Sequence, residues 1–255
     1  MPELSVISPI FNAARYLEEM LDSVAALSVS YEHLVIDGGS DDGTVELLAS
    51  RQDEQLRWVS EADRGQTHAV NKGLRSATGD VLTWLNGDNA YLPGTVEQAL
   101  DVLKDRPEID AVFGGIEIVD EHGAVRRRYV PPPYSWQRYL FMGDYIPTET
   151  VLFRRRLLEG APSLDERFVD AADYDFFLRL LHRRRVVRLQ EPLLRYRYHP
   201  DSKTARDPWL AQAEHMVIRR QWARGHRDLL LMESFDRAKR AVLPRISSWP
   251  RPYPP

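Results

Sequence analysis

The chain has no cysteine among its 255 residues, which excludes disulfide bonds and thiolate metal sites and is compatible with a reducing compartment. No apolar run approaches the ~20 residues needed to span a bilayer. The first four residues lead directly into a strand-like run, so we expect no signal peptide and a cytoplasmic protein. The formal charge of −4 gives no overall basic footprint, so we expect no nucleic-acid partner.

The first part of the chain alternates strand-like and helix-like segments. Apolar runs at residues 4–8, 33–37, 56–60, 81–85 and 110–114 predict strands, and the segments between them have helical spacing. The helix after the fourth strand is expected to start at Pro93, in a position that tolerates proline. This alternation predicts an α/β protein with a doubly wound, mostly parallel, Rossmann-like sheet.

The pattern changes after about residue 115. Residues 116–130 predict a hairpin that turns at 121–123, and later segments predict a helix over 172–182 and a strand over 186–189. Residues 207–242 predict two helices joined near Gly225, a C-terminal helical appendage through which a homodimer could form. The last twelve residues contain five prolines and predict an irregular tail.

Polar residues follow three of the predicted strands. They are Asp37, the acidic stretch 61–63, and the turn Asn86-Gly87-Asp88-Asn89. Ligands of doubly wound sheets bind beyond the carboxyl ends of the strands, so these clusters predict one site at one edge. Taken alone, residues 86–89 are typical of a turn that Asp88 stabilises.

Five segments occur in an order and spacing similar to those of family 2 glycosyltransferases. They read SVISPIFNAARYLEEMLDSV, VIDGGSDDGT, SEADRGQTHAVNKGL, ATGDVLTWLNGDNAYLPG and DYDFFLRL, and they cover roughly residues 4–200. The resemblance implies the GT-A fold. It also implies transfer of one sugar from a nucleotide-diphosphate donor, with a UDP-sugar favoured, and with inversion at the anomeric carbon.

The resemblance implies a Mn²⁺ or Mg²⁺ site that neutralises the leaving diphosphate. Asp88 matches the last acidic residue of the family's Asp-x-Asp motif, which touches the metal. Asn86 replaces the first and can still bond a ribose hydroxyl. His199, which follows an alternating strand, is a second candidate ligand for the metal or the diphosphate. A lone histidine is more often structural, so both interpretations of His199 stay open.

The same resemblance places the nucleotide of the donor on the strand ends. Phe11 offers a stacking face, and Arg64 beside a helix N-terminus suits a phosphate. Gly38 stands where the family has the aspartate that reads the uracil edge, and Asp37 fits either a donor contact or a turn carboxylate. The implied donor-binding set is Pro9, Phe11, Asn12, Asp37, Asp63, Arg64, Gln66, Asn86, Gly87 and Asp88.

Inversion by direct displacement needs a base that removes the proton of the acceptor hydroxyl, and a carboxylate suits that task. Asp173 matches the position of the family's base, at the start of a predicted helix, although Ala172 replaces the preceding glutamate. Without the resemblance, Asp173 would be interpreted as a helix N-cap. Asp175, two residues further on, is the alternative candidate for the base.

The resemblance divides the chain into a GT-A domain over 1–204, with a nucleotide-binding half over 1–115 and an acceptor half over 116–204. C-terminal helices over 205–243 and the proline-rich tail over 244–255 follow. The acceptor is expected to be a glycan, a lipid-linked molecule or another hydroxyl acceptor such as a protein or a small metabolite, with a role in polysaccharide or cell-envelope biosynthesis. Three arginine triplets, 126–128, 154–156 and 183–185, fit either a solvated face or peripheral contact with anionic lipid at the inner face of the plasma membrane.

Two other functional classes stay open. A sugar nucleotidyltransferase shares the doubly wound sheet, but it normally has a glycine-rich loop after the first strand, and the loop here contains no glycine. A non-catalytic nucleotide-sugar-binding subunit would fit the departures at Gly38, Asn86 and Ala172, whereas the retained Asp88 and Asp173 favour an enzyme.

Overall fold

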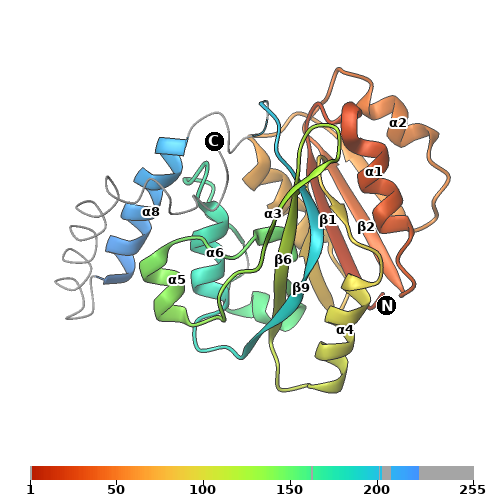
Figure 1. The fold of residues 1–255 in the computed structure, drawn as a ribbon. Helices are drawn as coiled ribbons and strands as arrows, with labels where there is room; N and C mark the ends of the chain where they lie inside the picture. The colour runs from red at the N-terminus through yellow and green to blue at the C-terminus, as the bar shows by residue number, and fades with distance from the viewer. Residues whose placement is uncertain (1, 162, 201, 203–207, 224–255) are drawn as a thin grey trace.

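The computed structural model describes residues 2–161, 163–200, 202 and 208–223 (Figure 1). The strands are β1 (Leu4–Ile10), β2 (Tyr31–Asp37), β3 (Leu56–Ser60), β4 (Val81–Trp84), β5 (Ala90–Tyr91), β6 (Ala111–Val119), β7 (Val125–Tyr129), β8 (Leu152–Arg154) and β9 (Val186–Arg197). The helices are α1 (Ala14–Ala25), α2 (Thr44–Ser50), α3 (Gln66–Ser76), α4 (Thr95–Asp105), α5 (Trp136–Met142), α6 (Ala172–Leu180) and α8 (Pro208–Ala223), with short 3₁₀ helices η1 (Thr148–Thr150) and η2 (Arg155–Glu159).

The strands form one nine-stranded mixed sheet with the order β3-β2-β1-β4-β8-β6-β9-β5, and β7 pairs with β6. The pairings of β1 with β2 and β4, of β2 with β3, and of β6 with β9 are parallel. The pairings made by β5, β7 and β8 are antiparallel. The predicted doubly wound α/β class is confirmed, and the carboxyl ends of β1 to β4 share one edge.

Helices cover both faces of the sheet and enclose two cores (Figure 1). The apolar faces of α1, α2 and α4 pack on one side, through residues such as Leu17, Leu48 and Leu100. On the other side α3, α5, α6 and α8 enclose an aromatic core that includes Tyr139 and Phe176. Strand β1 is buried at every position, as expected of a central strand covered on both faces.

Several predicted boundaries are wrong. Strand β6 joins the predicted strand 110–114 to the first arm of the predicted hairpin, because the glycines at 114 and 115 interrupt the apolar pattern without ending the strand. A Cβ at Gly115 would lie 2.4 Å from the carbonyl oxygen of Tyr129, so glycine permits a close approach there. Helix α4 starts at Thr95 rather than Pro93, because Gly94 with φ of 73° precedes it. Strand β9 is longer than predicted, and α6 ends at Leu180.

The C-terminal appendage begins with α8, which corresponds to the first of the two predicted late helices. The second predicted helix and the proline-rich tail lie outside the described residues, and the division of the chain at 115 and 204 stays a prediction. None of the helices that the structure describes is long and apolar enough to cross a membrane.

Candidate active site

The turn between β4 and β5 carries the predicted Asn86-Gly87-Asp88 motif. The backbone N–H of Asn89 donates to the carbonyl of Asn86 at 3.2 Å and closes the turn. A Cβ at Gly87 would lie 2.9 Å from Cβ of Ala13 and 3.0 Å from Cγ2 of Ile10. Glycine therefore lets this turn lie directly against the carboxyl end of β1 and the residue before α1.

Asp88 projects from this turn toward His199, which follows β9. Its Oδ2 lies 3.2 Å from Nε2 of His199. The other carboxylate oxygen of Asp88 and Nδ1 of His199 are buried and have no hydrogen-bond partner among the described residues. The ring of Tyr16 packs on His199 with a centroid separation of 5.3 Å. The structure thus brings together the two predicted metal ligands, which lie 111 residues apart in the sequence.

The chemistry of this pair fits a divalent cation. An oxygen and an imidazole nitrogen are ligands that Mn²⁺ accepts, and the unpartnered buried oxygen of Asp88 is available for coordination. Within the described chain, no group of three or more His, Cys, Asp and Glu residues could hold a metal by itself. Such sites commonly take one or two protein ligands and complete the coordination sphere with substrate phosphates and water.

Glu149, a residue that the sequence reasoning missed, lies under the same turn. Its Oε1 accepts the backbone N–H of Asn86 at 2.6 Å, and both carboxylate oxygens accept from Nδ2 of Asn89, at 3.0 and 2.7 Å. Glu149 is only 5% exposed. Burial and then the charge of Asp88 raise the pKa of Glu149 to about 8. The only sequence signal that could have pointed to Glu149 was the presence of one acidic residue among the mostly uncharged residues around η1.

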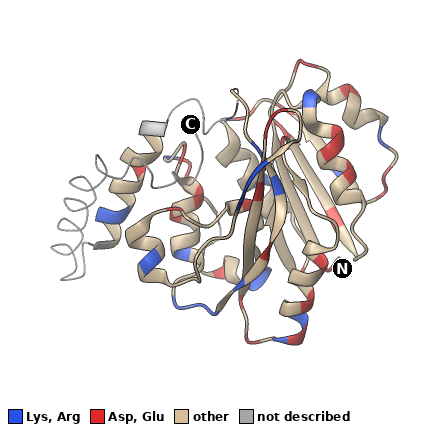
Figure 2. Ribbon diagram, viewed as in Figure 1, with Lys and Arg blue, Asp and Glu red and all other residues tan. Residues whose placement is uncertain are grey.

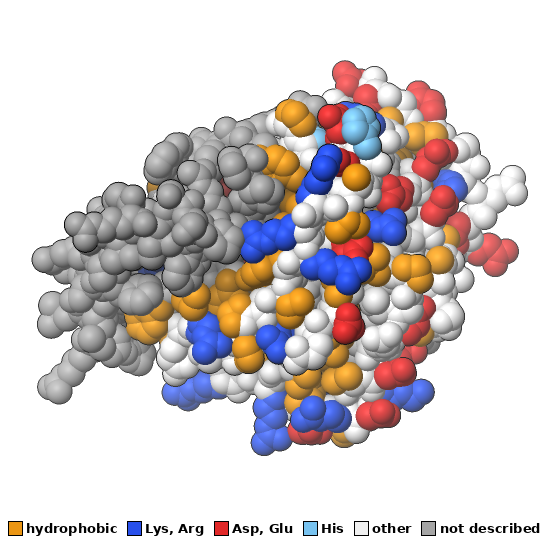
Figure 3. All heavy atoms as spheres, viewed as in Figure 1, with side chains coloured by type: hydrophobic (Ala, Val, Ile, Leu, Met, Phe, Trp, Pro, Cys, Tyr) orange, Lys and Arg blue, Asp and Glu red, His pale blue; other side chains and the backbone are white. Residues whose placement is uncertain are grey.

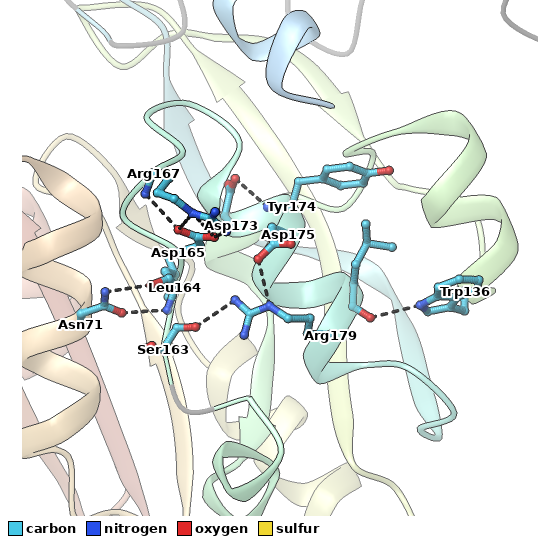
Figure 4. A network of polar contacts seen from close by, with 11 residues as sticks. Asn71, Trp136, Ser163, Leu164, Asp165, Arg167, Asp173, Tyr174, Asp175 and Arg179 are labelled. Atoms are coloured by element: carbon cyan, nitrogen blue, oxygen red, sulfur yellow. Dashed lines mark hydrogen bonds and ion pairs between the residues drawn. The ribbon is translucent and has the colours of Figure 1, made fainter. Parts of the chain in front are cut away.

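Asp173, the predicted base, lies at the second position of α6 and is held on two sides. Its Oδ2 accepts the hydroxyl of Thr148 at 2.6 Å. Its Oδ1 accepts the backbone N–H of Tyr174 at 2.8 Å (Figure 4). The N-cap of α6 is Ala171, so Asp173 is not the cap residue. The charge of Asp173 also contributes to the raised pKa of Glu149, and Thr148, which donates to Asp173, precedes Glu149 in η1.

Asp175, the fallback base, points elsewhere and is used in packing. Its Oδ2 accepts from Nε of Arg179 at 2.9 Å, and Arg179 donates in turn to the carbonyl of Ser163 (Figure 4). Asp175 is 6% exposed, and burial raises its pKa. These contacts favour Asp173 over Asp175 as the group that faces a substrate.

The predicted donor residues after β1 differ in exposure. Pro9 is buried within the strand, whereas Phe11 is 65% exposed. Asn12 has φ of 50°, and its Oδ1 accepts the backbone N–H of Asp41 at 3.1 Å. This contact joins the loops that follow β1 and β2 and presents the ring of Phe11 to solvent at the sheet edge.

Asp37 is fully buried and its carboxylate serves the turn after β2. It accepts the backbone N–H groups of Gly39 and Ser40, the hydroxyl of Ser40, and the hydroxyl of Ser60 at 2.6 Å. Of the two interpretations of Asp37, these contacts favour the turn carboxylate. The carboxylate of Asp63 lies beside Gly38, because a Cβ built on this glycine would be 3.2 Å from Oδ2 of Asp63.

The two remaining predicted donor residues bond to protein groups. The guanidinium of Arg64 pairs with Glu166 at 2.6 Å and is 69% exposed. Gln66 donates from Nε2 to Oδ1 of Asn86 at 2.8 Å. The structure therefore gathers Gln66, Asn86 and Asp88 at one place and holds Arg64 at the loop before α6.

The arginine triplets have local partners at several positions. Arg126 pairs with Asp120 and Arg128 with Glu117, both across the β6–β7 hairpin. Acidic and basic residues are distributed over the whole described ribbon (Figure 2), and basic side chains on the face in Figure 3 are interspersed with hydrophobic ones. These contacts favour a solvated face for the triplets.

Comparison with known proteins places the chain in a family. Residues 5–158 match the family model described as Glycosyl transferase family 2. An uncharacterized glycosyltransferase of Mycobacterium tuberculosis is 32% identical over 182 residues, which cover 70% of this chain and 68% of that protein. For a Rickettsia felis relative, 32% identity over 136 residues covers 51% of this chain and 22% of that protein, so the chain spans about a fifth of that relative's length.

Solved structures share the fold. S. aureus TarS in complex with UDP-GlcNAc has a TM-score of 0.66 and 19% identity, over 80% of this chain and 61% of that chain. The mannosyltransferase PcManGT from Pyrobaculum calidifontis, in complex with GDP-Man and Mn²⁺, has a TM-score of 0.63 and 24% identity, over 88% and 65%. These likenesses confirm the predicted GT-A fold.

Proposed function

The chain belongs to glycosyl transferase family 2, and on that premise we propose that it is an inverting, non-processive glycosyltransferase. It transfers one sugar from a nucleotide-diphosphate donor, with a UDP-sugar favoured, to a hydroxyl of a glycan or lipid-linked acceptor. The observation that carries this proposal is the arrangement around η1. Thr148 holds Asp173, and Glu149 holds the turn of Asp88, so base and metal-ligand candidates flank one site.

The nucleotide is proposed to lie across the carboxyl ends of β1 and β4. Phe11 supports this because it is an exposed aromatic ring at that edge. Asp88 and His199 would hold Mn²⁺ or Mg²⁺ next to the diphosphate. A divalent cation, when bound there, supplies charge neutralisation for the leaving diphosphate.

Asp173 is proposed to act as the general base. Its carboxylate takes the proton of the acceptor hydroxyl while that oxygen attacks the anomeric carbon from the face opposite the diphosphate. The bond from the anomeric carbon to the diphosphate oxygen breaks in the same step, and the nucleoside diphosphate leaves. The bonds from Thr148 and Tyr174 fix the plane of this carboxylate, and each oxygen keeps a lone pair for the acceptor. Because Asp173 removes the proton during the attack, the acceptor hydroxyl does not have to be deprotonated before it binds.

The test is turnover of a donor panel by the purified chain. UDP-GlcNAc, UDP-glucose and GDP-mannose are each incubated with Mn²⁺ or with EDTA, and release of nucleoside diphosphate is measured with water as acceptor. Metal-dependent turnover of one donor is expected. If calorimetry shows nucleotide binding but no donor is turned over, even with glycan and lipid-linked acceptors, the chain is instead a non-catalytic binding subunit. If the chain releases pyrophosphate from a nucleoside triphosphate and a sugar phosphate, it is a nucleotidyltransferase.

Two further features, membrane association and homodimer formation, are also proposed. The absence of a membrane-crossing helix among the described residues leaves room for peripheral association with a membrane that carries a lipid-linked acceptor. Helix α8, together with the second late helix that the sequence predicts, is proposed as a surface for homodimer formation. Flotation with anionic vesicles and light scattering of the full chain test these two points separately.

A further inference from the structure

Helix α8 packs on the domain through one face. Ile218 is fully buried in the core that also contains α6, and Trp222 contacts the ring of Trp136 with a centroid separation of 5.3 Å. His215 packs on the ring of Tyr174 at 4.5 Å. These residues recur at helical spacing, so the inner face of α8 is fixed against α5 and α6.

Glu214 lies at the edge of this inner face and reaches the start of α6. Its Oε1 accepts the backbone N–H of Val169 at 2.8 Å, and its Oε2 accepts those of Asp170 and Ala171, both at 2.8 Å. Helix α6 has no side-chain cap of its own, because its N-cap residue is Ala171. Glu214 therefore holds the backbone of the N-cap residue and of the two residues before it, and it places a negative charge, which a helix N-terminus favours, at the start of α6.

The segment that Glu214 holds leads directly to Asp173. Upstream, the same loop is fixed to α3, since the side-chain amide of Asn71 bonds both the N–H and the carbonyl of Leu164, at 2.8 and 3.0 Å (Figure 4). Downstream, the hydroxyl of Thr148 bonds the carboxylate of Asp173. Between these two anchors, the contacts from Glu214 set where the first turn of α6 begins.

We infer that Glu214 is a positioning residue for Asp173, and that α8 thereby forms part of the active enzyme. This inference rests on the proposed function, in which Asp173 is the base. Loss of the three bonds lets the segment 169–171 rearrange and moves the carboxylate of Asp173 relative to the acceptor. Displacements of about 1 Å at a catalytic group cost on the order of a hundredfold in rate. Donor binding, which uses the ends of β1 and β4, is left intact.

The experiment compares Glu214→Ala, Glu214→Gln and Glu214→Asp in the full chain. For a donor that the wild type turns over, we expect kcat to fall by about tenfold to a hundredfold in Glu214→Ala and Glu214→Gln, with partial rescue in Glu214→Asp. The Kd for UDP or GDP with Mn²⁺ is expected to stay at the wild-type value. Backbone hydrogen exchange over 169–171 is expected to accelerate.

Ile218→Val is the matched control, because it loosens the same face of α8 without removing a hydrogen bond to the segment 169–171 and is expected to lower Tm by a similar amount. Its kcat should remain near the wild-type value. A wild-type kcat in Glu214→Ala, or an equal loss of kcat in Ile218→Val at equal loss of Tm, would overturn the positioning role and leave the proposed function standing. A wild-type chain that turns over no donor and no acceptor would overturn both.

Discussion

Glu149 accepts the backbone N–H of Asn86 over 2.6 Å, from a buried position beneath the turn that presents Asp88. The neighbouring Thr148 donates to Asp173. The 3₁₀ helix η1 therefore contacts both halves of the proposed reaction, the metal-ligand turn on one side and the base on the other. Because η1 bonds both the turn of Asp88 and the carboxylate of Asp173, it fixes the distance between them.

The raised pKa of Glu149 has a consequence for stability. Its pKa is about 8 in the folded chain against an ordinary value of 4.5, so the folded state binds a proton that the unfolded state releases between these values. Stability from Glu149 is therefore complete below about pH 4.5 and declines as pH rises to about 8. We expect the free energy of unfolding of the wild type, relative to Glu149→Gln, to fall by a few kcal/mol (~1.4 per pH unit) across this window.

Urea unfolding of both proteins at several pH values between 4 and 9 measures this difference. Glu46→Gln, at an exposed position on α2, serves as the control because it makes the same substitution at the surface. A difference between wild type and Glu149→Gln that is flat over the whole range would contradict the assignment.

Much of the fold was predictable because it depends on local periodicity. Strands β1, β2 and β4 are short apolar runs, and the helices between them show one apolar face, so the parallel half of the sheet followed from the sequence. The junction in β6 did not, because Gly114 and Gly115 are weak strand formers whose role is to admit β7 and β9 at close range. Such a role depends on partners far away in the chain.

In the site, too, some residues could be predicted from the sequence and others depend on distant partners. Asp88, His199 and Asp173 were predictable from the resemblance, and the structure places Asp88 against His199. Glu149 was not, because its contacts with Asn86 and Asn89 join residues 63 and 60 positions apart. The bonds from Glu214 to the segment before α6 were missed for the same reason, because they join residues 43 to 45 positions apart.

Gly87 is required by the close approach of the turn to β1. In Gly87→Ala the new methyl group would meet Cβ of Ala13 at 2.9 Å, so the turn must shift. We expect a loss of about 1–3 kcal/mol in the free energy of unfolding, together with weaker metal-dependent nucleotide binding. Gly160→Ala is the control, since its nearest neighbour is 3.9 Å away and its φ of −97° suits alanine.

Denaturant titration and calorimetry of these two variants measure both effects. The Gly160→Ala variant is expected to stay within about 0.5 kcal/mol of the wild type. If Gly87→Ala matches it in stability and in nucleotide affinity, the turn does not need to lie against β1 in the way that the structure indicates.

Asp88→Ala tests the metal site directly. Removal of the carboxylate leaves His199 as the single proposed protein ligand, so we expect the gain in UDP or GDP affinity on adding Mn²⁺ to fall by at least about tenfold, equivalent to ~1.4 kcal/mol. Calorimetric titrations with and without Mn²⁺ measure this gain. Asp101→Ala, an exposed acidic residue on α4, removes the same charge away from the site and should behave as the wild type. An undiminished Mn²⁺ effect in Asp88→Ala would remove Asp88 from the metal site.

Asp173→Asn separates binding from catalysis. Asparagine keeps the size of the side chain and can still accept from Thr148, but it does not take up a proton, so we expect kcat to fall by about 10²–10⁴-fold with the donor Kd unchanged.

Asp175→Asn is a matched control two residues further on, where the carboxylate bonds Arg179 and does not face the site. Its stability should fall while its kcat stays within the same order of magnitude. Single-turnover measurements with the donor at saturation distinguish the two variants. If Asp175→Asn lost the activity and Asp173→Asn kept it, the base would lie on the other face of α6, and the contact between Thr148 and Asp173 would be structural.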